Sequence, residues 1–339
     1  MKPLFNKKYT FLYLLMLSFV FITSSALVLD QIAKTERQVE TKNVVQIDSD
    51  FPPIPVLGVS TQFPIISGQA ALAIDIASGV TLYEKDPDKL LLPASTTKIV
   101  TALVAMDYYP DDMIVEVGRV IVEGQKMGLR QGEKISVGNL LMGLLVYSAN
   151  DAAEVLAQNY CAPRSPAPPA GGPGEAGFCG RDSFVIAMNQ KANELNLENS
   201  YFANPTGLDG NGDIASTAKD LVRISMVAMQ IPEFADIVKT KEITVSSVDG
   251  KISHKLYNIN ELVGQVEGVL GIKTGWTENA RENLVTYVVR DDHKVIIALL
   301  GSQDRFGETK ELIGWIFDNY TWEEVNPRKN LPLQPERIQ

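Results

Sequence analysis

The chain has 339 residues, 45% of them hydrophobic, and a formal net charge of −10 at pH 7. This length and composition can build a sizeable core with room for two lobes, so disorder throughout the chain is excluded. The acidic balance excludes nucleic acid as the main partner, because binding phosphate requires a basic face.

The N-terminal segment, residues 1–30, is expected to attach the protein to a membrane. Three lysines precede an uncharged stretch, residues 9–29, that is long enough to cross a bilayer. The lysines would stay cytoplasmic, which places everything after Asp30 outside the cytoplasm. The alternative is a cleaved signal peptide with a shorter apolar core, residues 11–22, after which the protein would be secreted. Residues 31–67, with four prolines, are expected to be a juxtamembrane spacer.

The first half of the folded part begins with a hairpin and continues with helices. Two apolar or alternating runs, residues 70–76 and 80–85, are joined by Ala77-Ser78-Gly79, which predicts a β-hairpin. A helix is expected from Ser95 to Asp107, whereas residues 111–134 give an ambiguous pattern. An apolar helix over residues 137–147, hydrophobic all round and therefore buried, precedes a second helix over residues 151–160.

The second half changes from helices to strands. Helical spacing recurs over residues 184–195 and 217–230, on either side of a Gly- and Asn-rich loop at residues 204–209. Short strands follow at residues 269–274, 283–289 and 294–301. A closing helix is expected over residues 308–320, and a polar tail over residues 321–339. This order predicts an α+β lobe interrupted by a mostly helical one, with residues 68–320 as the catalytic domain.

Ser95 and Lys98 form the first pattern with chemical meaning. Residues three apart on a helix share one face, so the Lys98 ammonium would lie within reach of the Ser95 hydroxyl. An amine that takes the proton of a serine turns that weak nucleophile into a strong one. The local pattern is equally consistent with Ser95 as a helix cap and Lys98 as a solvated side chain. Other parts of the chain must therefore decide between an activated nucleophile and a helix cap with a solvated lysine.

Two further short motifs favour the nucleophile. Ser148-Ala149-Asn150 ends the expected buried helix, and Lys273-Thr274-Gly275 ends an expected strand. S-x-x-K, S-x-N and K-T-G in this order are the set found in penicillin-binding proteins and serine β-lactamases. From about Gly68 to Tyr320 the chain also resembles one subgroup, the low-molecular-mass serine D-alanyl-D-alanine carboxypeptidases of the peptidase S11 type. The resemblance runs through Ala73–Gly79, Pro93–Lys98, Ser148–Ala152, Asn204–Asp209, Ser216–Ala218 and Gly271–Thr277.

The resemblance implies the α+β fold of the β-lactamases and DD-peptidases. In that fold an antiparallel sheet flanked by helices lies beside a mostly helical lobe, with the site in the groove between them. Residue types suggest the catalytic roles: Ser95 attacks the substrate carbonyl and Lys98, buried and neutral, is the general base. Ser148 would relay the proton to the leaving amine, and Asn150 would hold the substrate amide and fix Lys98. No metal or cofactor is expected.

Five residues are expected to bind substrate. Lys273 would supply positive potential for a terminal carboxylate, Thr274 a hydroxyl, and Gly275 the room for close approach to the strand edge. By resemblance, the backbone N–H groups of Ser95 and Trp276 would form the oxyanion hole, and Arg305 would lie near the carboxylate. Arg305 could instead be a surface residue, and Trp276 a packing residue.

Residues 161–180 form a Pro- and Gly-rich insertion that cannot be core. Its two cysteines, Cys161 and Cys179, are the only ones in the chain, and an oxidising compartment would join them as a disulfide. Closing this loop would stabilise the fold by about 3 kcal/mol in the chain-entropy model. Two free thiols are the alternative in a poorly oxidising envelope.

The sequence therefore predicts a serine carboxypeptidase that trims the last D-alanine from peptidoglycan stem peptides and is acylated by β-lactams. A serine β-lactamase is the nearest alternative, because it forms the same serine ester. A non-catalytic peptidoglycan-binding or penicillin-sensing domain is the second. Asp151, at a helix start, is expected to be a cap or dipole partner rather than a catalytic acid. His254 and His293 are expected to be structural or surface residues.

Overall fold

A computed structural model describes residues 51–59, 62–161, 179–210 and 213–325. The chain divides into two units after Phe51, and the fold below is that of the second unit. The expected anchor or signal peptide, residues 1–30, lies outside the described residues, as do residues 162–178 of the insertion and the end of the tail. Within the described ranges, no helix is both long and apolar enough to cross a membrane.

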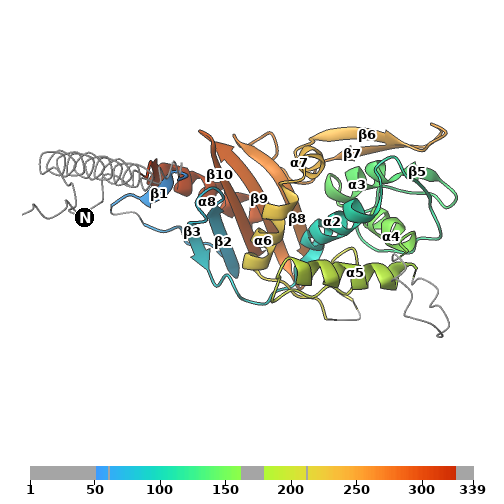
Figure 1. Cartoon of the computed structure of the whole chain (residues 1–339), viewed down its shortest axis with the longest axis horizontal. Helices are drawn as coiled ribbons and strands as arrows, with labels where there is room; N and C mark the ends of the chain where they lie inside the picture. The colour runs from blue at the N-terminus through green and yellow to red at the C-terminus, as the bar shows by residue number, and fades with distance from the viewer. Residues whose placement is uncertain (1–50, 60–61, 162–178, 211–212, 326–339) are drawn as a thin grey trace, which may run out of the picture. The chain divides into compact units, whose positions relative to one another are not determined.

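A five-stranded antiparallel sheet forms the centre of the folded part (Figure 1). Its strand order is β3-β2-β10-β9-β8, with bounds Thr81–Lys85, Ala70–Asp75, His293–Ser302, Arg281–Arg290 and Val269–Thr277. The predicted N-terminal hairpin (β2 and β3) and the three predicted C-terminal strands are all present. Because β2 pairs with β10, the two ends of the domain sequence contribute to one sheet.

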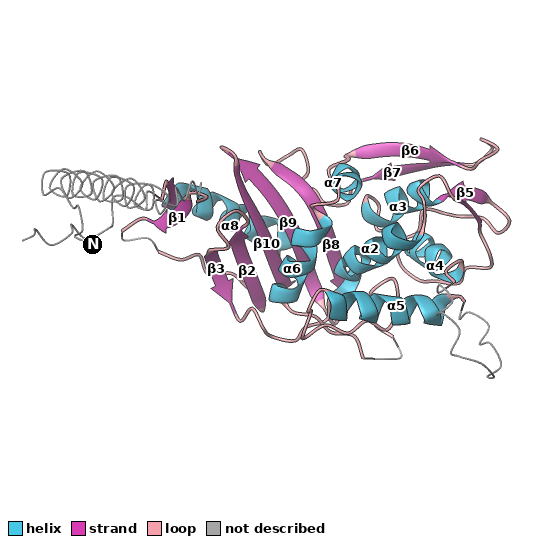
Figure 2. Ribbon diagram, in the orientation of Figure 1, coloured by secondary structure: helices cyan, strands magenta, loops and turns pink. Residues whose placement is uncertain are grey.

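The two faces of this sheet carry different helices (Figure 2). Successive side chains of a strand point to opposite faces, so one strand can serve two cores. Leu72, Ile296 and Ala298 join the core that includes helix α6 (Ala218–Ala228). Their neighbours Ala71, Ala73 and Ile297 join a second core with the C-terminal helix α8 (Arg305–Asn319). The all-apolar strands are thus explained by burial on both faces.

The helical lobe is continuous with the first of these cores. It consists of the 3-10 turn η1 (Ala94–Thr97) and four helices, α2 (Lys98–Tyr108), α3 (Val137–Leu145), α4 (Asn150–Gln158) and α5 (Arg181–Glu194). The apolar helix α3 is buried, as its sequence predicts, with Leu140 and Leu144 fully inaccessible. The helices therefore have the order that the sequence predicts, with bounds that differ by a few residues.

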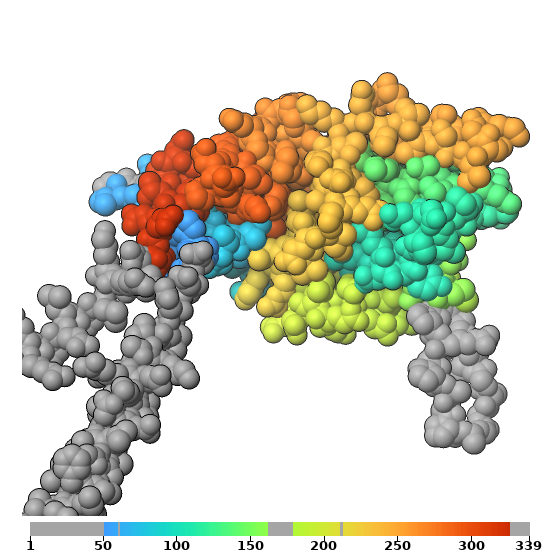
Figure 3. Space-filling model, turned by 45° about the horizontal axis from the view of Figure 1, so that its top comes forward, coloured from blue at the N-terminus to red at the C-terminus, as the bar shows by residue number. Residues whose placement is uncertain are grey.

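Several short elements are absent from the sequence prediction. They are β4 (Ile114–Glu116) with β5 (Lys134–Ser136), helix α7 (Pro232–Val238), and the hairpin β6 (Glu242–Ser246) with β7 (Ser253–Tyr257). The β6–β7 hairpin, gold in Figure 3, lies along the helical lobe, drawn in green. The hydrogen bonds that attach it there include those from Val248 N to Lys134 O and from Asn139 Nδ2 to Ser246 O.

One strand pair extends the ordered fold beyond the predicted bounds of residues 68–320. Strand β1 (Ile54–Leu57) lies in the segment predicted to be a spacer, and β11 (Tyr320–Glu323) lies at the predicted tail. The two strands pair antiparallel, with Pro55 opposite Trp322. Pro55 is buried whereas Ile54 and Val56 are exposed, which is the alternation of a strand with one covered face. This part of the predicted spacer therefore belongs to the fold.

Candidate active site

The three sequence motifs line one groove of about 610 Å³. Its walls come from η1, the start of α4, the end of β8 and the start of α8. All but two of the residues proposed for the site line this groove: Ser95, Ser148, Asn150, Thr274, Gly275, Trp276 and Arg305. The two others, Lys98 and Lys273, are buried behind its wall, 0% and 1% exposed.

Ser95 lies in the turn η1, and helix α2 begins only at Lys98. The alternative of Ser95 as the cap of this helix is therefore wrong: the capping position is Thr97, which makes no side-chain cap. A solvated Lys98 is also excluded by its complete burial. The Lys98 Nζ donates to Ser95 Oγ at 2.9 Å and to the carbonyl oxygen of Thr206 at 2.7 Å.

Burial lowers the pKa of Lys98 to about 7, against a smaller opposing effect of the Glu154 carboxylate. At neutral pH a large fraction of this amine is therefore unprotonated. An unprotonated amine 2.9 Å from Ser95 Oγ can accept the proton of the serine. When Lys98 is protonated, its ammonium donates a hydrogen bond to Ser95 Oγ. When Lys98 is neutral, the same contact is the path by which it takes the serine proton.

The Thr206 carbonyl that holds Lys98 is fixed by a tight loop. Asn204 Oδ1 accepts from Thr206 N, Thr206 Oγ1 and Gly207 N at 3.1, 2.8 and 2.7 Å. Gly207 has φ +79°, and a Cβ there would lie 1.9 Å from Ala94 O. The loop is therefore pressed against the turn that carries Ser95. Thr206 acts through its backbone, which explains why residue type alone did not assign it to the site.

Gly207→Ala is expected to lower the free energy of unfolding by well over 1 kcal/mol, because it adds a backbone collision to the strain of a positive φ. Gly250→Ala is the matched control, since Gly250 has φ +69° but no atom within 4 Å of an added Cβ. The control should lose only about 1 kcal/mol. Urea unfolding measures both. Equal losses in the two variants would contradict the close packing of the loop.

The second and third motifs meet through Lys273. Its Nζ donates to Ser148 Oγ at 2.7 Å and to Thr274 O at 2.9 Å. Burial and the neighbouring charges of Lys98 and Arg305 hold the pKa of Lys273 well below its usual range. Ser148 has φ +60°, an uncommon conformation for a residue other than glycine, and it aims the hydroxyl at this amine. Ser148 therefore lies in a hydrogen-bonded chain with a second buried amine.

Asn150 begins α4 and is held by the loop that precedes β5. Its backbone N donates to Gln125 O, and its Nδ2 donates to Glu123 O, both at 2.7 Å. Its Oδ1 is buried without a hydrogen-bond partner in the described structure, as is Thr274 Oγ1. The expected hydrogen bond from Asn150 to Lys98 is not found among the described residues, and the Thr206 carbonyl fixes Lys98 instead. Asn150 thus keeps an acceptor for a bound molecule.

Asp151 lies in the first turn of α4, where a carboxylate complements the helix dipole as predicted, but it does not cap the helix. Its carboxylate accepts from the backbone N of Met127, Gly128 and Leu129 at 2.9 to 3.0 Å. Asp151 therefore anchors the 123–133 loop to α4 beside Asn150. No residue type in this loop predicts its role, because its contacts to α4 are made by backbone atoms.

Gly275 brings the strand motif against the nucleophile turn. A Cβ on Gly275 would lie 2.9 Å from Pro93 O and 3.1 Å from Ser95 N. The next residue, Trp276, is 61% exposed and lines the groove, so the packing alternative is wrong for it. Arg305 also lines the groove, where its Nη1 donates to Gly275 O at 3.1 Å and its buried Nε has no partner in the described structure. The surface alternative for Arg305 is therefore wrong.

The comparisons with known proteins agree with this geometry. The model of the peptidase S11 family, D-alanyl-D-alanine carboxypeptidase, matches residues 58–304. The chain belongs to this family. The chain is 31% identical over 267 residues to the D-alanyl-D-alanine carboxypeptidase DacB2 of Mycobacterium tuberculosis, covering 76% of this chain and 85% of the relative. A D-alanyl-D-alanine endopeptidase of Pseudomonas aeruginosa is 32% identical over 274 residues, covering 78% of this chain and 81% of the relative.

Solved structures of family members establish the fold. The Streptomyces K15 DD-transpeptidase superposes with a TM-score of 0.65 at 29% identity, covering 76% of this chain and all of that one. A D-alanyl-D-alanine carboxypeptidase from Mycobacterium tuberculosis gives a TM-score of 0.66 at 30% identity, over 80% of this chain and 97% of that one. The predicted α+β fold of the DD-peptidases is confirmed.

Outside the groove, a disulfide joins Cys161 and Cys179 at the two ends of the insertion. The residues between the cysteines lie outside the described part of the chain, so the structure assigns the insertion no place at the groove. Among the described residues, no group of three or more His, Cys, Asp and Glu side chains is placed to hold a metal ion.

Proposed function

We propose that this DD-peptidase is a carboxypeptidase that removes the terminal D-alanine of peptidoglycan stem peptides through an acyl-enzyme on Ser95. The observation that carries the proposal is the 2.9 Å contact between Ser95 Oγ and the fully buried Lys98 amine. It combines a nucleophile that lines the groove with a base of suitable pKa. Membership of the D-alanyl-D-alanine carboxypeptidase family supports the substrate class.

In the acylation step, Ser95 Oγ attacks the carbonyl between the two D-alanines while Lys98 takes the hydroxyl proton. The backbone N–H groups of Ser95 and Trp276 would stabilise the oxyanion; loss of one such donor typically costs about 3 kcal/mol of barrier. The carbon–nitrogen bond then breaks while Ser148 relays the proton held by Lys98 to the leaving amine of D-alanine, which returns Lys98 to its neutral form. In the second half, water attacks the Ser95 ester, and Lys98 takes a proton from the water and returns it to Ser95 Oγ as the ester bond breaks.

Substrate orientation would depend on the groups that have unused hydrogen-bonding capacity. Asn150 Oδ1 and Thr274 Oγ1 are buried without partners in the described structure, and they would bind the substrate amide N–H and its terminal carboxylate. Lys98 and Arg305 lie close enough to Lys273 for each to disfavour charge on its amine. A substrate carboxylate would offset this repulsion, so the site would favour peptides with a free carboxyl end over amidated ones.

The rate of Ser95 acylation is expected to rise with pH and to reach half of its plateau near pH 7. The reason is that only the unprotonated amine of Lys98 accepts a proton, and burial lowers its pKa to about 7. The measurement is the second-order rate of labelling by a fluorescent penicillin between pH 5 and 9. A profile that stays flat across this range would contradict the assignment of Lys98 as the base.

One experiment separates the proposed activity from its alternatives. The purified protein is incubated with a labelled penicillin and, separately, with a peptide that ends in D-Ala-D-Ala. Stable label on Ser95 together with release of D-alanine supports the carboxypeptidase. Rapid loss of the penicillin label supports a serine β-lactamase. Labelling or binding without any release of D-alanine supports a penicillin-sensing or peptidoglycan-binding domain. A cross-linked peptide as a third substrate tests for the endopeptidase activity named for the Pseudomonas relative.

We further propose a place at the cell membrane, with residues 1–30 as an uncleaved anchor and the catalytic domain outside the cytoplasm. The uncharged stretch at residues 9–29 after three lysines supports this orientation. The intact mass of the protein recovered from its native host tests it. A mass that lacks the first residues, or recovery in the medium, would favour signal-peptide cleavage and secretion.

A further inference from the structure

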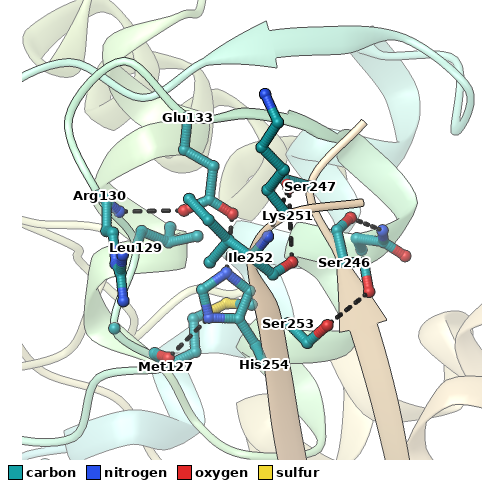
Figure 4. Close-up of polar contacts among 12 residues, drawn as sticks. Met127, Leu129, Arg130, Glu133, Ser246, Ser247, Lys251, Ile252, Ser253 and His254 are labelled. Carbon is teal, nitrogen blue, oxygen red and sulfur yellow. Dashed lines mark hydrogen bonds and ion pairs between the residues drawn. The ribbon is translucent and has the colours of Figure 1, made fainter. Parts of the chain in front are cut away.

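A buried contact between His254 and Glu133 joins the β6–β7 hairpin, near its turn, to the 123–133 loop. Figure 4 shows the imidazole of His254, on β7, between Met127 and Glu133. Its Nδ1 lies 3.0 Å from Met127 O, and its Nε2 lies 2.7 Å from Glu133 Oε1. The second carboxylate oxygen of Glu133 accepts from Arg130 N at 3.0 Å. The side chains of His254 and Glu133 are 4% and 0% exposed, so water takes little part in these contacts.

The imidazole of His254 bridges two oxygen atoms that belong to one loop. One is the carbonyl oxygen of Met127, and the other is a carboxylate oxygen of Glu133. The pair then links two backbone sites, Met127 O and Arg130 N, within one loop.

Met127 connects this pair to the groove. Its carbonyl oxygen faces His254 while its N–H donates to Asp151 Oδ1 at 3.0 Å. Asp151 is the neighbour of Asn150, whose own backbone N and side-chain Nδ2 are held by Gln125 O and Glu123 O at 2.7 Å. Every contact that fixes Asn150 on this side therefore comes from residues 123–129. That segment is attached to α4 at one side and to His254 at the other.

We propose that His254 and Glu133 are positioning residues, which hold the 123–133 loop so that Asn150 presents its free Oδ1 to the substrate. The role rests on the proposed function, because that function assigns Asn150 to substrate binding. A buried ionic pair is not needed to fill this space, since apolar side chains of the same volume usually stabilise a core equally well. The contribution of the pair is to hold two backbone groups, Met127 O and Arg130 N, in place. These groups belong to a loop that has no regular secondary structure between residues 117 and 133.

The test begins with His254→Ala in the otherwise intact protein. The value of kcat/KM for D-alanine release is expected to fall about 10- to 100-fold, since a misplacement near 1 Å in a site can cost about 100-fold. The midpoint of the pH profile should stay near pH 7, because Lys98 and its contacts are untouched. Amide hydrogen exchange at Met127, Gly128 and Leu129 should become faster, since their bonds to Asp151 lose support.

Conservative variants separate positioning from stability. His254→Asn places an amide nitrogen near the former Nδ1, so it can still donate to Met127 O, and it should restore kcat/KM to within about 3-fold of the wild type. Both His254 variants leave Glu133 without its partner, so both should melt at a similarly lowered temperature. Glu133→Gln can donate to the ring and accept from Arg130 N, and it should remain active. Glu133→Leu removes both bonds and should resemble His254→Ala.

His293→Ala is the matched control, because His293, at the start of β10, stacks on Trp322 of β11 and not on the 123–133 loop. It should leave kcat/KM and the exchange of residues 127–129 unchanged. The proposal is overturned by wild-type kcat/KM in His254→Ala, by His254→Asn being as slow as His254→Ala, or by equal losses in Glu133→Gln and Glu133→Leu. If the wild type releases no D-alanine, the proposed function fails, whereas faster exchange in His254→Ala would still establish the support of the loop.

Discussion

Ser95→Ala is expected to abolish stable labelling by penicillin and to lower the release of D-alanine by at least about 10⁴-fold. No other oxygen in the groove lies in contact with the Lys98 amine in the described structure, so water would have to attack the amide directly. Removal of the nucleophile in serine peptidases costs about 10⁶-fold in kcat, which sets the scale. A discontinuous assay for free D-alanine and gel fluorescence of the labelled enzyme measure the two losses.

Ser253→Ala provides the control for this variant. Ser253 is exposed on β7, where its hydroxyl contacts that of Ser246, so the same substitution should change neither rate. The stability of Ser95→Ala should also stay close to that of the wild type, because Lys98 retains its bond to Thr206 O. D-alanine release by Ser95→Ala at more than one hundredth of the wild-type rate would refute the acyl-enzyme mechanism.

Lys98→Met is expected to reduce acylation of Ser95 by about 10²- to 10⁴-fold, the usual contribution of a general base. Methionine fills most of the space without the cost of keeping an amine in a dry site. The variant should therefore unfold at the same temperature as the wild type or above it. Lys89→Met, at an exposed position, is the control and should change neither property. Acylation of Lys98→Met within 10-fold of the wild type would contradict the role of Lys98.

The pH dependence of the free energy of unfolding provides an independent test of the lowered pKa of Lys98. The pKa of Lys98 is about 7 in the folded state and 10.5 in an ordinary environment. Between these values the unfolded chain binds the extra proton, so stability rises with pH. Lys98 alone contributes a slope of up to about 1.4 kcal/mol per pH unit. The stability difference between Lys98→Met and the wild type should shrink from pH 7 to pH 9, as urea unfolding at both pH values would show.

Much of the fold was predictable because it rests on periodic patterns. The hairpin at residues 70–85, the apolar helix at residues 137–147 and the three C-terminal strands all carry strong apolar periodicity, and all are present. The β6–β7 hairpin was missed because β7 reads Ser-His-Lys-Leu-Tyr, in which the inward residues are His254 and Leu256. A buried histidine does not look apolar in sequence. Strand β1 was missed because Pro55 within it, together with Pro52 and Pro53 before it, is typical of a linker.

The active-site side chains were predictable for a different reason, since nucleophile, base and amide chemistry require particular residue types. The supporting groups were not predictable, because most of them are backbone atoms. Lys98 is held by the carbonyl of Thr206, and Asn150 by the carbonyls of Glu123 and Gln125. Any residue can supply a carbonyl, so residue type marks none of these positions, although Thr206 lies within the Asn204–Asp209 segment that carries the resemblance. Only the fold brings residue 206 within 2.7 Å of an amine at residue 98.

The pairing of β1 with β11 makes the two ends of the folded domain neighbours in space. The chain therefore enters and leaves the folded domain at adjacent positions. The three motifs have one order in the sequence, but the groove depends on their arrangement in space and not on that order. A gene that joined these ends and began at another loop would encode the same site in a different order.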